Sequence, residues 1–318
     1  MFIIEASGLA RTFKARGRTI EAVRGVDLTV GVGEIVGFLG PNGAGKTTTM
    51  RMLTTLLRPT AGTATVAGGD LLKAPAQVRK RIGYVAQAGG TEPSCTVMEE
   101  LLIQADLYHV DRIEARRRAD LLVKQLDLAG LEERYTQDLS GGQRRRVDIA
   151  LGLVHQPPLL FLDEPTTALD PQSRSNMWDH IRRLREELSM TVFLSTHYLD
   201  EADELCDRIL IMDYGRIVAE GSPAELKRRL CADVAVIGLG GDPATASLML
   251  SQQPGVREAT PVGSSVHLVV ENGEQAVLGL VRFLDYSGFA PHSLRLDRPS
   301  LDDVFLTLTG RSLREEGE

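Results

Sequence analysis

A glycine-rich segment at residues 40–47 constrains this chain more than any other feature. It reads Gly-Pro-Asn-Gly-Ala-Gly-Lys-Thr and fits the pattern G-x-x-x-x-G-K-[ST]. The short apolar stretch 34–39 precedes it, and Met50, Leu53 and Leu57 follow it at helical spacing. A strand, a glycine turn and a helix in this order let backbone N–H groups converge on phosphate oxygens. The segment therefore predicts a phosphate-binding loop in an α/β fold, in preference to an ordinary glycine turn.

The side chains of this loop suit a nucleotide and its metal. Lys46 would neutralise the β- and γ-phosphates, and the Thr47 hydroxyl is a hard oxygen ligand for Mg²⁺. The nucleotide-binding residues expected from this segment are Gly40, Pro41, Asn42, Gly43, Ala44, Gly45, Lys46, Thr47 and Thr48.

The composition is that of a globular protein of about two domains. Its 318 residues are 43% hydrophobic and 25% charged, which excludes a mainly disordered chain, a coiled coil and a disulfide-stapled miniprotein. The net charge of −7 provides no basic surface at whole-chain level, so nucleic acid is not an expected partner. There is no run of about 18 uncharged apolar residues, no basic secretory signal, and only three scattered cysteines. These features predict a cytosolic protein.

A second segment places two acids after a buried strand. Residues 159–162 are uniformly apolar and lead directly into Asp163 and Glu164. Ligands gather at the carboxyl ends of parallel strands. Asp163 would hold magnesium, through water, and Glu164 would orient or deprotonate the attacking water. The alternative is that Asp163 only caps a helix.

A third segment begins another helix. Residues 139–143 read Leu-Ser-Gly-Gly-Gln, and a helical stretch follows to about His155. A serine and two glycines at a helix start form an anion-binding N-terminus. Ser140 could instead be a simple N-cap on a permissive turn.

In this order, the three segments resemble the nucleotide-binding subunit of ABC (ATP-binding cassette) transporters, over residues 2 to about 222. Residues 40–47 match the Walker A motif, residues 139–143 the signature motif, and residues 159–163 with Glu164 the Walker B motif and catalytic glutamate. Shorter matches, to the Q-loop, the D-loop, the H-loop and the A-loop aromatic, are Gln87, Asp170, His197 and Phe13.

The resemblance implies a head-to-tail dimer with each ATP between the Walker A motif of one chain and the signature of the other. Glu164 and His197 would be catalytic, and Phe13 would stack on adenine unless it is a core residue. The residues that would contact ATP across the dimer interface are Ser140, Gly141, Gly142, Gln143 and Asp170. The residues that would bind Mg²⁺ are Thr47, Gln87 and Asp163.

The fold implied is a P-loop NTPase cassette of the ABC-ATPase type over residues 1–225. It would have a RecA-like core, an antiparallel β subdomain and a helical subdomain at about 92–150. A helix is expected at 171–189, with Asp170 as N-cap and Pro171 at its first position. Residues 232–311 show the order β-α-β-β-α-β of a small α+β ferredoxin-like domain, and residues 312–318 are expected to be a loose tail.

The last segment of the sequence indicates which branch of the ABC family the chain resembles. Residues 299–306, Pro-Ser-Leu-Asp-Asp-Val-Phe-Leu, are similar to the tail motif of the daunorubicin-resistance branch of ABC exporters, although they could merely form a packing helix. Gln143 departs from many members of that branch. The consecutive arginines 144–146 are expected to point in different directions around a helix, and Trp178 is interpreted as a packing or solvated position.

This branch pairs an ATPase chain with a separately encoded multi-span permease. The resemblance therefore implies a peripheral ATPase at the cytoplasmic side of the membrane that energises export, of multidrug, antibiotic or lipid type. One alternative is a soluble, non-transport ABC ATPase acting on ribosomes or nucleic acid. Another is a regulatory cassette that binds ATP without hydrolysing it.

Overall fold

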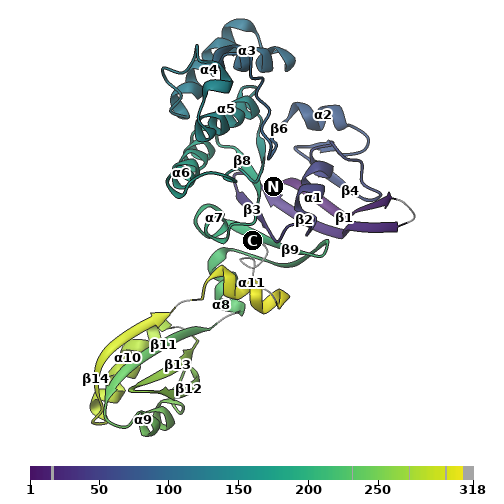
Figure 1. Ribbon diagram of the computed structural model, residues 1–318. Helices are drawn as coiled ribbons and strands as arrows, with labels where there is room; N and C mark the ends of the chain where they lie inside the picture. The colour runs from purple at the N-terminus through teal and green to yellow at the C-terminus, as the bar shows by residue number, and fades with distance from the viewer. Residues whose placement is uncertain (16–17, 231, 272, 298, 311–318) are drawn as a thin grey trace. The chain divides into compact units, whose positions relative to one another are not determined.

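The computed structural model describes residues 1–15, 18–230, 232–271, 273–297 and 299–310. The chain divides into two compact units, Met1–Glu220 and Gly221–Glu318 (Figure 1). The predicted tail, residues 312–318, lies outside the described residues. No helix of the described residues has the length and apolar character needed to cross a membrane.

The first unit is built on a six-stranded sheet with the order β10-β9-β3-β8-β7-β6. Strands β9, β3, β8, β7 and β6 pair in parallel, so their carboxyl ends meet at one edge. Strands β3, β7 and β8 are buried along their whole length, as the continuous apolar runs predict. The strands are β3 (Ile35–Leu39), β6 (Ile82–Val85), β7 (Leu159–Asp163), β8 (Thr191–Thr196), β9 (Arg208–Asp213) and β10 (Arg216–Gly221).

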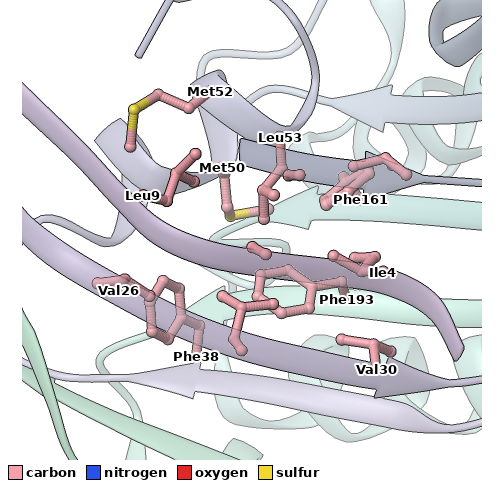
Figure 2. Close-up of a cluster of buried hydrophobic side chains, with 14 of the residues drawn as sticks. Ile4, Leu9, Val26, Val30, Phe38, Met50, Met52, Leu53, Phe161 and Phe193 are labelled. Carbon is pink, nitrogen blue, oxygen red and sulfur yellow. The ribbon is translucent and has the colours of Figure 1, made fainter. Parts of the chain in front are cut away.

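A second, antiparallel sheet has the order β2-β1-β4-β5. The main core lies between the two sheets and includes side chains of α1 (Figure 2). Phe193 is at its centre, with its ring centroid 5.6 Å from the centroids of both Phe38 and Phe161. The strands are β1 (Phe2–Ala15), β2 (Arg18–Gly31), β4 (Ala61–Val66) and β5 (Gly69–Asp70).

Helices complete the first unit, and α3 and α4 lie at one end of it (Figure 1). The predicted helix at 171–189 is confirmed as α6, with Asp170 as N-cap and Pro171 in its first turn. The helix expected to reach Leu57 ends earlier, at Leu53, because Thr55 adopts a left-handed backbone with φ 65°. The helices are α1 (Lys46–Leu53), α2 (Pro75–Lys80), α3 (Val97–Leu107), α4 (Arg112–Gln125), the 3₁₀ helix η1 (Thr136–Asp138), α5 (Gly141–Leu153), α6 (Pro171–Leu188) and α7 (Leu199–Leu205).

The second unit contains a four-stranded antiparallel sheet with the order β12-β13-β11-β14. With one helix after β11 and another after β13, this is the predicted ferredoxin-like arrangement. Ile237, Leu268, Leu250 and Leu284 bring the sheet and both helices into one buried core. Its elements are α8 (Pro223–Leu230), β11 (Asp233–Gly240), α9 (Pro243–Leu250), β12 (Val256–Val262), β13 (Ser265–Val270), α10 (Gly273–Tyr286), β14 (Ala290–Asp297) and α11 (Leu301–Thr309).

Candidate active site

The glycine-rich loop joins β3 to α1, and two of its glycines are required by their surroundings. Gly45 has φ 109°, and a Cβ on it would lie 2.5 Å from the carbonyl oxygen of Ala22. A Cβ on Gly40 would lie 2.2 Å from the carbonyl oxygen of Met212. Both contacts are far shorter than van der Waals distance, so a side chain on Gly45 would push the loop away from β2, and one on Gly40 would push it away from β9.

Lys46 opens α1 and is only 4% exposed. Its ammonium donates hydrogen bonds to the carbonyl oxygens of Gly40, at 2.6 Å, and Pro41, at 2.9 Å. A buried cation is therefore held inside the curve of the loop, where phosphate oxygens would meet it. This buried charge and the glycine-lined backbone fit an anionic nucleotide.

Asp163 ends β7 beside the loop, as the sequence predicts for a carboxylate at a strand end. Its Oδ1 accepts hydrogen bonds from the Ser195 hydroxyl at 2.6 Å and the Thr47 hydroxyl at 3.2 Å. The Tyr84 hydroxyl donates to Oδ2 at 3.4 Å, and burial, followed by the Asp163 charge, raises the pKa of Tyr84. A carboxylate beside a threonine hydroxyl supplies the hard oxygens that suit Mg²⁺.

Glu164 follows directly and turns the chain away from the sheet with φ 47°. Three side chains surround its Oε2: Gln87 Nε2 donates at 2.8 Å, the Thr167 hydroxyl donates at 3.0 Å, and His197 Nδ1 lies 3.4 Å away. The neighbouring His197 is the main cause of a lowered Glu164 pKa, which burial opposes. The result is an ionised, largely buried carboxylate that can orient water or accept its proton.

The predicted signature residues lie at the exposed start of α5. The Ser140 hydroxyl accepts a hydrogen bond from the Gln143 backbone N–H at 3.3 Å, and Gln143 Oε1 accepts one from the Ser140 N–H at 3.0 Å. Ser140 is therefore an N-cap, as the alternative interpretation holds, within a reciprocal capping box. Asp170 likewise caps α6. The contacts of these residues across a dimer interface stay predictions.

Phe13 lies on β1 and is half-buried, outside the buried core cluster of the first unit. The Arg11 guanidinium carbon lies 4.7 Å from the centre of its ring. This location does not favour the alternative that Phe13 is a core residue, and its stacking on adenine stays a prediction.

The tail motif forms α11 in the second unit. Ser300 caps the helix with a capping box to Asp303, and Leu301, Val304 and Phe305 are buried. The helix contacts α8. These residues therefore pack within the second unit, which is compatible with their similarity to the tail motif of the branch.

Two residues, Arg145 and Trp178, make contacts that no signal in the sequence indicates. The consecutive arginines do point in different directions, but nothing in the sequence indicates that the buried Arg145 guanidinium contacts the backbone around Glu164. Trp178, for which the sequence suggests a packing or solvated position, donates from Nε1–H to the buried Glu201 carboxylate at 3.1 Å. Each of these contacts joins residues far apart in the chain, so no local pattern announces them.

This arrangement defines an ATPase of the ATP-binding cassette class. The family model described as "ABC transporter" matches residues 23–167, and the model "ATP-binding protein DrrA1-3-like, C-terminal domain" matches residues 221–309. The chain is 42% identical to the daunorubicin/doxorubicin resistance ATP-binding protein DrrA of Streptomyces peucetius, with 99% of this chain and 96% of that protein covered. It therefore belongs to the ABC transporter ATP-binding proteins of the DrrA type.

Two further comparisons agree. The chain is 37% identical to the Nod factor export ATP-binding protein I of Burkholderia orbicola (strain AU 1054), covering 92% of this chain and 93% of that protein. The dimeric, ADP- and phosphate-bound cassette MJ0796 in a post-hydrolysis state matches 69% of this chain and 98% of its own, with 28% identity and a TM-score of 0.64. This chain is thus an ABC ATPase that hydrolyses ATP to drive transport.

Proposed function

We propose that this chain is the ATP-hydrolysing subunit of an exporter. It would act as a homodimer, bound to a separately encoded multi-span permease at the cytoplasmic face of the membrane. The observation that carries the proposal is Glu164, an ionised carboxylate fixed by Gln87, Thr167 and His197 beside the glycine-rich loop. A cassette that only binds ATP needs no such carboxylate, so hydrolysis is favoured over a purely regulatory role.

The proposed division of labour follows from the geometry. Lys46 and the loop N–H groups bind the phosphates, and Glu164 accepts a proton from the attacking water. His197, which lowers the pKa of Glu164, would also contact the γ-phosphate. Thr47, Asp163 and Gln87 would hold Mg²⁺, which neutralises phosphate charge when bound.

The two glycines at the start of α5 support the proposal that a second copy of this chain binds there. A Cβ on Gly141 would meet no atom within 4 Å, and one on Gly142 would come no closer than 3.8 Å, to Ser173. Neither glycine has a left-handed φ. Glycine is a weaker helix former than alanine, and no close contact among the described residues would exclude a Cβ at either position. Two glycines here favour the close approach of a group from outside the chain, such as a nucleotide on a partner cassette.

Export is the direction that the relatives' names favour. The Burkholderia relative is named for Nod factor export and the Streptomyces relative for daunorubicin and doxorubicin resistance. Since the relatives are named for different compounds while their ATPase chains are similar to this one, we propose that the permease selects the cargo. A drug or antibiotic is the class that we favour for this chain.

The test is Glu164→Gln, which keeps the side-chain shape and removes the ionised base. We expect the variant to bind ATP, to lose hydrolysis, and to accumulate as an ATP-bound dimer on size-exclusion chromatography. Lys46→Ala is the matched control and should neither bind ATP nor dimerise. Full turnover by Glu164→Gln would contradict the role of Glu164.

The Glu164→Gln variant also tests whether the binding partner is a membrane permease. Expressed in its native host and extracted gently with ATP present, it should co-purify with a polytopic membrane protein in stoichiometric amount. Co-purification with ribosomal proteins or nucleic acid would overturn the transport function and leave the ATPase chemistry intact.

A further inference from the structure

Three consecutive arginines on α5 point to three different places. Arg144 donates to the carbonyl oxygens of Thr136 and Gln137. Arg146 donates to those of Leu126, at 3.0 Å, and Asp127, at 3.1 Å. These two arginines therefore hold α5 to neighbouring segments of the helical part of the cassette.

Arg145 faces the other way, toward the strand ends. Its side chain is 9% exposed, and its guanidinium donates hydrogen bonds to the backbone carbonyl oxygens around Glu164. Nε donates to Pro165 at 2.9 Å, and Nη2 donates to Asp163 at 2.9 Å and Glu164 at 3.3 Å. Because Glu164 adopts a left-handed backbone just after β7, the Glu164 and Pro165 carbonyls lie beyond the strand ladder, and Arg145 supplies donors there. The Thr167 N–H is a second donor to the Glu164 carbonyl, at 3.4 Å.

The same guanidinium also holds the segment that carries Gln87. Nη1 donates to the carbonyl oxygen of Ala86 at 2.6 Å. One helical turn further along α5, Asp148 Oδ1 accepts from the Gly90 N–H at 2.9 Å, and Asp148 Oδ2 lies 3.9 Å from Arg145 Nη1. Residues 86–90 are thus attached to α5 at both of their ends.

We propose that Arg145 is a positioning residue for hydrolysis, one that fixes the backbones carrying Gln87 and Glu164 so that these two side chains meet. The inference rests on the proposed role of Glu164 as the base. The Arg145 guanidinium contacts both backbones, and the Gln87–Glu164 hydrogen bond of 2.8 Å lies between them. A planar guanidinium has five donors in fixed directions and holds all four of these diverging carbonyls at once, whereas an ammonium has only three donors on a single nitrogen.

Arg145→Gln tests the proposal, with Arg146→Gln as the matched control on the same helix. A small misplacement of a catalytic group can cost about 100-fold in rate. We expect Arg145→Gln to lower kcat by about 10- to 100-fold. ATP affinity, measured by equilibrium titration, should stay within about threefold, because Lys46 and the loop are untouched. Like Glu164→Gln, the variant should accumulate the ATP-bound dimer, whereas Arg146→Gln should turn over normally.

Two results would overturn the role of Arg145. Equal kcat for the wild type and Arg145→Gln, or an equal fall in Arg145→Gln and Arg146→Gln, would overturn the proposal. A wild type without ATPase activity would instead contradict the proposed function, not the role of Arg145. Should Arg145→Gln fail to fold, Arg145→Lys is judged by the same criteria, since it keeps the charge beside Asp148 and loses the fork.

A double-mutant cycle with Gln87→Ala distinguishes a positioning role of Arg145 from a general loss of structure, because it measures the coupling between the two residues in kcat. If Arg145 acts by keeping Gln87 and Glu164 together, the effect of Arg145→Gln on kcat should shrink by at least about threefold once Gln87 is gone. Fully additive effects on log kcat would contradict this mechanism.

Discussion

The Ser195 hydroxyl donates a 2.6 Å hydrogen bond to Oδ1 of Asp163, its register partner on the neighbouring parallel strand. The Ser195 oxygen also accepts a hydrogen bond from the backbone N–H of Glu164, at 3.1 Å. One fully buried side chain thus orients the proposed metal ligand and supports the backbone of the proposed base.

Ser195→Ala should therefore weaken both functions. We expect about a tenfold lower kcat, a higher Mg²⁺ concentration for half-maximal activity, and a loss of about 1–2 kcal/mol in unfolding free energy, because Asp163 Oδ1 loses the shorter of its two hydrogen bonds and keeps the one from Thr47. Magnesium titration of the ATPase and urea denaturation measure these changes. Ser247→Ala, which removes a hydroxyl that donates to the Ala259 carbonyl in the other unit, should alter stability alone. An unchanged magnesium dependence in Ser195→Ala would contradict this role.

The neighbouring His197 is the main cause of the lowered Glu164 pKa. Replacing it with alanine should raise that pKa toward the ordinary glutamate value, so the carboxylate becomes protonated at a higher pH. The acid limb of the kcat/KM profile should consequently shift upward in pH, in addition to any loss of rate. A residual activity whose acid limb stays in place, or moves to lower pH, would show that Glu164 does not control this limb.

Gly45 and Gly43 separate two reasons for glycine in the phosphate loop. Both have left-handed φ, but only at Gly45 would a Cβ clash, 2.5 Å from the Ala22 carbonyl oxygen. Each alanine variant should lose about 1 kcal/mol to the unfavourable φ. Gly45→Ala should lose more, since its loop must also move, and its ATP affinity should fall further. Equal stabilities in thermal melts of the two variants would contradict the clash.

Much of the first unit could be predicted because its signals are local. The apolar runs that became β7 and β8 mark strands buried on both faces, and Asp170 with Pro171 marks the start of α6. The order of these segments brought Asp163, Glu164 and His197 to the carboxyl edge of the sheet. A parallel sheet places such residues together, whatever the length of the connections.

What could not be predicted depends on contacts between distant segments. Arg144, Arg145 and Arg146 look alike in the sequence, and the packing of α5 decides which one faces the strand ends. The premature end of α1 depends on the backbone of Thr55, which the apolar spacing through Leu57 does not reveal. Such features require the tertiary structure because their partners are not neighbours in sequence.

Glu201 is another such feature, a carboxyl with no solvent exposure. Its Oε1 accepts hydrogen bonds from the Thr166 hydroxyl at 2.8 Å and from Trp178 Nε1 at 3.1 Å. Thr166 lies just after Glu164 and Pro165 in the chain, and Trp178 belongs to α6. Burial raises the pKa of Glu201 above the ordinary value, despite these donors.

This raised pKa fixes the sign of a pH effect on stability. Between the ordinary glutamate pKa and the raised one, the folded chain holds a proton that the unfolded chain has released, so the Glu201 contribution falls as pH rises. Glu201→Gln cannot titrate, and its amide oxygen still accepts from Thr166 and Trp178. The variant should therefore gain stability relative to the wild type as pH rises through this window, in urea denaturation at a series of pH values. Glu204→Gln, an exposed change on the same helix, should show a small and nearly constant difference. A difference for Glu201→Gln that is equally constant would mean that Glu201 enters the folded state already ionised, and that the Thr166 and Trp178 donors outweigh its burial.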